Sequence, residues 1–106
     1  MQDDVIFYQE GKTLTAYIKC EIDHHVAGRI RQKIDRALFE GRPEWLILDF
    51  SDVRFMDSSG IALIIGRAET SRAIGAGLRL SNLSESLMKL VRLSGIDKIN
   101  GISIRN

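Results

Sequence analysis

The sequence is poor in the features that mark disulfide-bonded, metal-cluster or membrane-spanning chains. It has one cysteine, Cys20, which excludes an internal disulfide and a metal cluster held by several thiolates. Its longest apolar run, Ile61–Ile65, is far too short to cross a bilayer. The acidic start, Met1–Asp4, lacks the basic segment of a signal peptide. We therefore expect a cytoplasmic location and no membrane partner.

An excess of charge of one sign is also missing. Fifteen basic and fourteen acidic residues give a net charge of +1, so no overall field attracts nucleic acid. One predicted helix carries four basic residues without interleaved aromatics, which suits a solvated face: Arg29, Arg31, Lys33 and Arg36. A chain of 106 residues with 44% apolar residues fits a single domain over residues 1–106.

The first third of the chain changes its hydrophobic period from two to that of a helix. Val5–Gln9 is rich in strand-forming residues, and residues 13–20 alternate apolar and polar side chains, so the two predict a hairpin across the turn at Gly11. From Val26 the apolar residues recur at helical spacing until Gly41–Pro43. Asp23 is the predicted N-cap of this helix.

The remainder alternates strands and helices. Trp45–Phe50 is nearly continuous apolar sequence, which predicts a strand covered on both faces. A second helix should begin near Ser58, and Gly75–Gly77 should close it. Its predicted core-facing residues are Ile61, Ile64, Ile65 and Ala68. The last elements are a strand over 78–80, a helix capped by Ser84 and ended by Ser94–Gly95, and a strand over 102–104.

The order β-β-α-β-α-β-α-β defines the fold class. Strands joined through helices imply right-handed crossovers and a parallel sheet, and the first two strands add an antiparallel hairpin. We therefore predict an α/β fold with a mainly parallel mixed sheet and helices packed against it.

The segment Asp57-Ser58-Ser59-Gly60 lies between a buried strand and a helix. Such junctions lie at the carboxyl end of a parallel sheet, where α/β proteins place their sites. A serine at a helix N-terminus tolerates an added phosphate, because free N–H groups and the positive end of the helix dipole face it. By themselves, however, these residues are most often helix caps.

Three segments together resemble the STAS-domain anti-sigma factor antagonists. They are Glu21-Ile22-Asp23-His24-His25, then Phe55-Met56-Asp57-Ser58-Ser59-Gly60 with Ile61 and Gly66-Arg67, and Leu93-Ser94-Gly95-Ile96 with Lys98-Ile99. Their order and spacing match over roughly residues 5–104, and the pattern is most similar to the branch that acts in the sporulation sigma-F pathway. The resemblance implies the STAS fold for the whole chain.

In that family the antagonist binds an anti-sigma factor that is also a serine kinase, and so releases a sigma factor for transcription. The resemblance implies that this kinase inactivates the antagonist by phosphorylating Ser58 and that a serine phosphatase restores it. It places Glu21, Asp23 and His24 at the partner surface. It also implies that Asp57 and Ser59 flank the acceptor and that Gly60 permits close approach.

Two positions depart from the family pattern. Cys20 stands where the family often has glycine, which alters the turn beside the partner surface. The family usually continues into a C-terminal helix, which is expected to be absent here because the sequence ends at Asn106, soon after the last strand.

Other chemistries fit the sequence poorly. A hydrolase elbow needs Gly-x-Ser-x-Gly, which neither Ser58 nor Ser59 satisfies. His24 and His25 are adjacent on a helix, should point apart and lack a supporting acid cluster, so we expect no metal site. Cys20 is expected to be a small buried hydrophobe. The resemblance leaves nucleotide binding near Asp23 and Ser58 open, but the sequence shows no phosphate loop and we expect no cofactor. Nothing in the sequence supports an enzymatic activity, and we expect none.

One alternative function remains open on sequence grounds. A STAS module can dock partners or a small ligand without phosphorylation, in another signalling or transport system. The two readings differ in whether Ser58 is modified.

Overall fold

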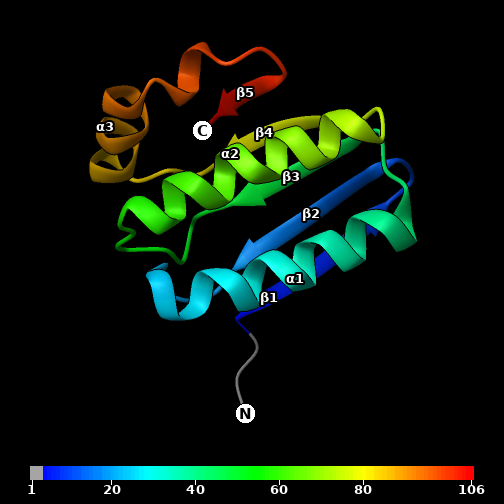
Figure 1. Cartoon of the computed structure of the whole chain (residues 1–106), viewed down its shortest axis with the longest axis horizontal. Helices are drawn as coiled ribbons and strands as arrows, with labels where there is room; N and C mark the ends of the chain where they lie inside the picture. The colour runs from blue at the N-terminus through cyan, green and yellow to red at the C-terminus, as the bar shows by residue number, and fades with distance from the viewer. Residues whose placement is uncertain (1–3) are drawn as a thin grey trace.

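The computed structural model describes residues 4–106 (Figure 1). Residues 1–3 belong to the acidic start that predicts no signal peptide, and they lie outside the described residues. The elements follow in the order β1 (Val5–Glu10), β2 (Thr13–Ile18), α1 (His24–Gly41), β3 (Trp45–Asp49), α2 (Ser58–Ala73), β4 (Gly77–Ser81), α3 (Glu85–Ser94), the 3-10 helix η1 (Ile96–Lys98) and β5 (Ile102–Arg105). The predicted order is confirmed, and η1 is an addition to it.

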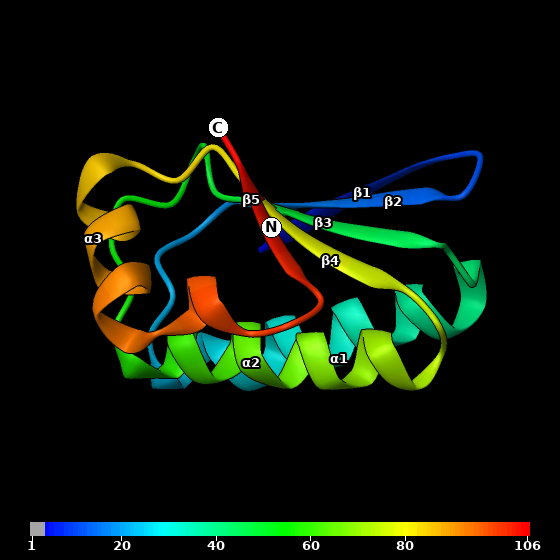
Figure 2. The same cartoon turned by 90° about the horizontal axis from the view of Figure 1, so that it is seen from above.

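The five strands form one sheet in the spatial order β1-β2-β3-β4-β5. β1 and β2 are antiparallel, whereas β2, β3, β4 and β5 are parallel neighbours. The predicted mixed sheet with an N-terminal hairpin is therefore confirmed. The chain leaves β2 and β3 at the same edge of the sheet, so α1 and α2 begin close to each other (Figures 1 and 2).

The core lies between the sheet and the two long helices. α1 buries Ile30, Ile34 and Leu38, which recur at the helical spacing seen in the sequence. The strands contribute alternate residues to the same layer: Leu14, Ala16, Ile18, Leu46, Leu48, Leu78 and Leu80. Burying each of the larger aliphatic side chains stabilises the fold by about 1.5–3 kcal/mol.

The expectation that β3 is covered on both faces is wrong. Trp45 is 38% exposed and Ile47 is half-buried. Figure 2 shows the reason, because α1 and α2 both lie on the same side of the sheet. The continuous apolar run therefore reflects a strand with one covered face and one partly open face.

The apolar face of α2 also differs from the prediction. Ile64 and Ala68 are buried as expected, but Ile61 and Ile65 are only half-buried. Leu63, Arg67 and Ser71 are buried instead. α2 packs against both α1 and β4, so its covered surface is broader than one apolar stripe.

Two element boundaries differ from the sequence prediction for identifiable reasons. The second strand ends at Ile18 rather than Cys20, because the chain then turns to pair Ile22 with Met56. Gly77 does not close α2 but begins β4, where its N–H donates to the carbonyl of Glu44 at 2.9 Å. A Cβ atom there would meet the ring of Trp45 at 2.6 Å, so glycine is required by close packing.

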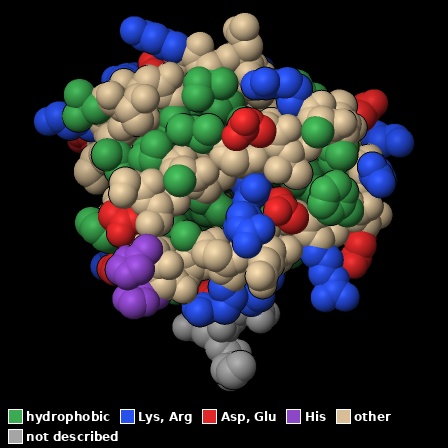
Figure 3. All heavy atoms as spheres, in the orientation of Figure 1, with side chains coloured by type: hydrophobic (Ala, Val, Ile, Leu, Met, Phe, Trp, Pro, Cys, Tyr) green, Lys and Arg blue, Asp and Glu red, His purple; other side chains and the backbone are tan. Residues whose placement is uncertain are grey.

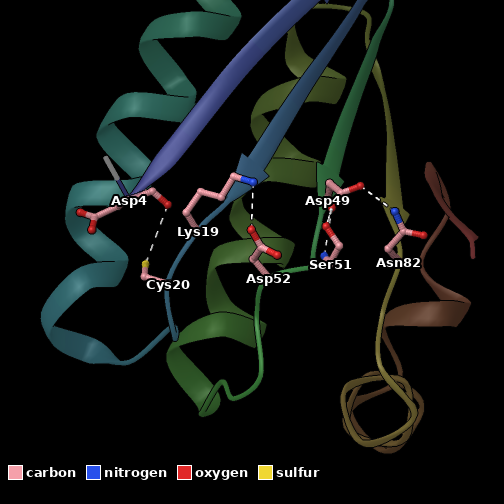
Figure 4. Close-up of polar contacts among 7 residues, drawn as sticks. All are labelled: Asp4, Lys19, Cys20, Asp49, Ser51, Asp52 and Asn82. Carbon is pink, nitrogen blue, oxygen red and sulfur yellow. Dashed lines mark hydrogen bonds and ion pairs between the residues drawn. The ribbon is translucent and has the colours of Figure 1, made fainter. Parts of the chain in front are cut away.

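Asp49 ties together the chain segments that leave β3 and β4 (Figure 4). Its carboxylate is almost fully buried and accepts hydrogen bonds from Ser51 N–H (2.9 Å), Ser51 Oγ (2.6 Å) and Asn82 Nδ2 (2.8 Å). Asn82 has a positive φ of 58°, a conformation that asparagine tolerates better than most residues. The contact therefore fixes the carboxyl edge of the sheet.

Replacing Asp49 with alanine should lower the free energy of unfolding by about 2–3 kcal/mol, because a buried charged acceptor of three hydrogen bonds is lost. Asp52→Ala is the matched control. Asp52 forms an exposed ion pair with Lys19 at 2.9 Å, and its loss should cost less than about 1 kcal/mol. Urea denaturation at pH 7 measures both, and equal losses would contradict the role assigned to Asp49.

A second prediction concerns pH. Arg29 Nε donates to Asp4 Oδ2 at 2.6 Å, and this hydrogen bond lowers the pKa of Asp4 below its ordinary value. Because the folded pKa is the lower one, the stabilisation is present above the unfolded value of about 4. It is lost as pH falls through the folded pKa. Asp4→Asn should therefore be less stable than the parent at pH 7 and match it in strong acid.

Thermal melts across this pH range test the prediction, with Asp97→Asn as a control for loss of an exposed carboxylate. A stability difference between Asp4→Asn and the parent that stayed constant with pH would show that the ion pair is not its source.

Candidate functional site

The two segments that enter α1 and α2 pair with each other. Ile22 N–H donates to the carbonyl of Phe55 at 3.0 Å, and Asp57 N–H donates to the carbonyl of Ile22 at 3.1 Å. These bonds form a short parallel bridge between Ile22 and Met56, whose side chains are both buried. The bridge brings together two motifs that are separate in the sequence, residues 21–25 and 55–60.

Aspartates cap both helices at this point. Asp23 Oδ1 accepts the N–H groups of His25 at 2.9 Å and Val26 at 3.1 Å, as predicted for the start of α1. Asp57 Oδ1 accepts the N–H of Ser59 at 2.8 Å at the start of α2. The hydrogen bonds from Val26 and His25 lower the pKa of Asp23, so this carboxylate is charged at neutral pH.

Ser58 and Ser59 differ in accessibility. Ser58 is the first residue of α2 and is exposed, whereas Ser59 is half-buried. Glu21 and His24 are also exposed beside the bridge. Of the two serines, Ser58 is therefore the one more open to a reagent or partner.

Gly60 has an internal role in the structure. It is buried, and a Cβ atom on it would lie 2.7 Å from Met56 Sδ and 2.8 Å from Met56 Cβ. The close approach that this glycine permits is thus between α2 and the bridge residue of the same chain. Gly60 therefore allows the first turn of α2 to pack directly against Met56.

The other candidate groups behave as follows. The rings of His24 and His25 lie 4.1 Å apart between centroids, so the expectation that they point apart is wrong. Both residues are exposed in the first turn of α1. Among residues 4–106, no three His, Cys, Asp or Glu side chains come together as a metal site.

Cys20 is only half-buried, not fully buried as expected. Its Sγ lies 3.9 Å from the carbonyl of Asp4, and burial raises the pKa of the thiol (Figure 4). A raised pKa lowers the thiolate fraction, which makes the thiol less reactive. Within residues 4–106, no helix combines the length and the apolar character that crossing a membrane requires.

Two further features were not identified from the sequence as parts of the site. Phe55, which opens the second resembling segment but was given no role there, is 52% exposed immediately before the bridge. A groove of about 310 Å³ also runs between α1 and α2, from His24 and Ser59 to Arg67. Sequence patterns gave no sign of the groove, because its lining residues come from two helices.

Comparison with known proteins agrees with this arrangement. Residues 5–106 match the STAS domain family. An anti-sigma F factor antagonist from Lysinibacillus sphaericus is 37% identical over 76 residues, which cover 72% of this chain and 65% of that protein. The anti-sigma-B factor antagonist of Bacillus subtilis is 30% identical over 106 residues, covering all of this chain and 95% of that one.

A solved structure extends the likeness to three dimensions. The anti-sigma factor antagonist SpoIIAA in its unphosphorylated form superposes with a TM-score of 0.79 at 29% identity, over 96% of this chain and 88% of that one. The phosphorylated form of SpoIIAA from Bacillus gives 0.72 at 29% identity, over 96% and 91%. This chain therefore belongs to the STAS domain family and is a relative of the anti-sigma factor antagonists.

Proposed function

We propose that this protein is an anti-sigma factor antagonist switched by phosphorylation of Ser58. In its unphosphorylated form it binds an anti-sigma factor that is also a serine kinase, and a sigma factor is released. The kinase phosphorylates Ser58 and ends the interaction, and a serine phosphatase restores it. The protein acts as a cytoplasmic binding partner and catalyses no reaction itself.

The observation that supports this proposal best is the placement of Ser58. It is the exposed member of the Ser58–Ser59 pair and the first residue of a sixteen-residue helix. The related SpoIIAA has been solved in phosphorylated and unphosphorylated forms, so a protein similar to this chain is modified by phosphorylation.

The phosphate is expected to act on the partner rather than on the fold. Free N–H groups and the positive end of the α2 dipole stabilise a negative group at the helix start. The added charge of about −1.5 to −2 would, however, lie beside Asp57 and near Asp23. Like charges packed at an interface cost several kcal/mol, which corresponds to at least a hundredfold in affinity.

The partner surface follows from the same geometry. Glu21, Asp23 and His24 come from one side of the bridge, and Asp57 and Ser59 come from the other. Gly60 supports this surface indirectly, because it packs against the buried Met56. Phe55, half-exposed at the edge, supplies an aromatic side chain of the kind that anchors protein interfaces.

The proposal predicts a single modified residue. Incubation of the protein with ATP and a kinase-like anti-sigma factor from the same genome should yield one phosphate on Ser58, and Ser58→Ala should abolish it. Ser59→Ala is the matched control and should still be phosphorylated. Intact mass and peptide mapping measure both. Phosphate on Ser59 alone would contradict the site, and tight binding without any phosphorylation would favour the docking-module alternative.

A second prediction separates interface from fold. Ser58→Asp should weaken kinase binding about a hundredfold while changing the free energy of unfolding by less than about 1 kcal/mol, because an acid at a helix start is tolerated. Gln32→Asp, exposed in the middle of α1, adds the same charge elsewhere and should leave binding unchanged. Calorimetric titration and thermal melts supply the data. Unfolding of Ser58→Asp would argue against an interface mechanism.

A further inference from the structure

The groove between α1 and α2 has a construction that the fold alone does not explain. Small residues line much of it: Ala27, Gly28, Ala62 and Gly66. His24 and Ser59, at the starts of α1 and α2, also line it, so the groove reaches the residue next to Ser58. Figure 3 shows the same face, on which apolar, basic and acidic side chains are interspersed next to the two histidines at the start of α1.

Two glycines in helix interiors keep this groove open. Glycine disfavours a helix relative to alanine, so an interior glycine normally answers a packing or backbone need. Neither Gly28 nor Gly66 has a positive φ, and a Cβ atom on either would meet nothing within 4 Å. No atom of the described chain therefore requires glycine at these positions, and the space beside them is open.

Among residues 4–106, the lining of the groove includes two arginines and no carboxylate. Arg67 is 95% buried, and its Nε lies 3.0 Å from Asp35 Oδ1 in an orientation that forms no hydrogen bond. Its Nη1 has no hydrogen-bond partner among residues 4–106. Arg31 approaches the same carboxylate only to 3.8 Å. Arg31 and Arg67 line the groove, whereas the two carboxylates that act on Arg67, those of Asp35 and Glu69, do not. Burial lowers the pKa of Arg67 because its charge is poorly solvated, and both carboxylates oppose this effect.

We propose that this groove receives an acidic side chain, with a small apolar neighbour, from the serine kinase that the protein binds. This proposal rests on the proposed function and adds the second contact of that interface. The carboxylate would pair with the half-exposed guanidinium of Arg31, near the buried Arg67, and the glycines would let the partner backbone approach α1 and α2 closely.

A partner segment fits the groove better than a free ligand. Its volume is at the lower limit of small-molecule pockets, which are usually more enclosed. The groove is also continuous with the Ser58 surface through His24 and Ser59. A kinase seated over Ser58 therefore has this end of the groove within its footprint.

The test uses substitutions that raise the helix propensity of α2 and at the same time fill the groove. Gly66→Ala should raise the melting temperature by roughly 2–6 °C, because alanine favours the helix and meets no neighbour. The same variant should bind the kinase more weakly, and Gly66→Leu should lose roughly tenfold or more in affinity. A purely structural role for Gly66 would not give greater stability together with weaker binding.

One control and one further variant accompany these substitutions. Ala73→Leu places the same leucine side chain on the exposed end of α2, away from the groove, and should leave binding unchanged. Arg31→Gln should weaken binding roughly tenfold and reduce its dependence on salt, because a pair of opposite charges is removed. Titration calorimetry of the full chain with the kinase measures affinity.

The outcomes separate the two proposals. Normal binding by Gly66→Leu and Arg31→Gln, with Ser58→Asp still defective, would overturn the groove assignment and leave the proposed function intact. No binding of the parent protein to any such kinase would overturn both. Stabilisation of the parent by sodium butyrate or phosphate, lost in Arg31→Gln, would assign the groove to a free anion instead.

Discussion

The pairing of Ile22 with Met56 is the contact on which the site depends. Two backbone hydrogen bonds and two buried side chains join the entrances of α1 and α2. Without this pairing the two capping aspartates would belong to unrelated loops. With it, both helix starts face the same end of the molecule, and Gly60 allows α2 to begin directly against Met56.

Two opposing electrostatic effects meet at the site: the positive ends of the helix dipoles and the negative capping carboxylates. The capping carboxylates of Asp23 and Asp57 already accept the backbone N–H groups at the helix starts, so part of the positive end of each helix is neutralised. The proposed phosphate at Ser58 would still meet the remaining helix dipole, which would make its charge tolerable to the folded chain. The proposed partner would pack against the same surface and meet that negative charge. The phosphate is therefore expected to cost little in folding free energy and much in binding free energy.

Much of the fold could be predicted from local sequence patterns. The alternation of residues 13–18 and the helical spacing of Ile30, Ile34 and Leu38 reflect one buried face each, and such patterns depend only on residue order. The covered surfaces of α2 and β3 could not be predicted this way, because they depend on where α1 lies. The same holds for the site. The helix caps and the exposed serine could be predicted because they depend on neighbouring residues in the sequence. The groove and the bridge could not, because they join residues that are distant in the sequence.

The ring of Trp45 is the only indole in the chain, and its surroundings make it a natural spectroscopic probe. It lies against Gly77, with the Arg79 guanidinium 4.9 Å from the ring centre, on the open face of the sheet. Because Trp45 begins β3 and Ser58 follows beyond the other end of that strand, the two are separated by the length of the sheet. Its fluorescence therefore reports whether the sheet is intact and is insulated from events at the helix starts, so one intrinsic signal distinguishes unfolding from recognition.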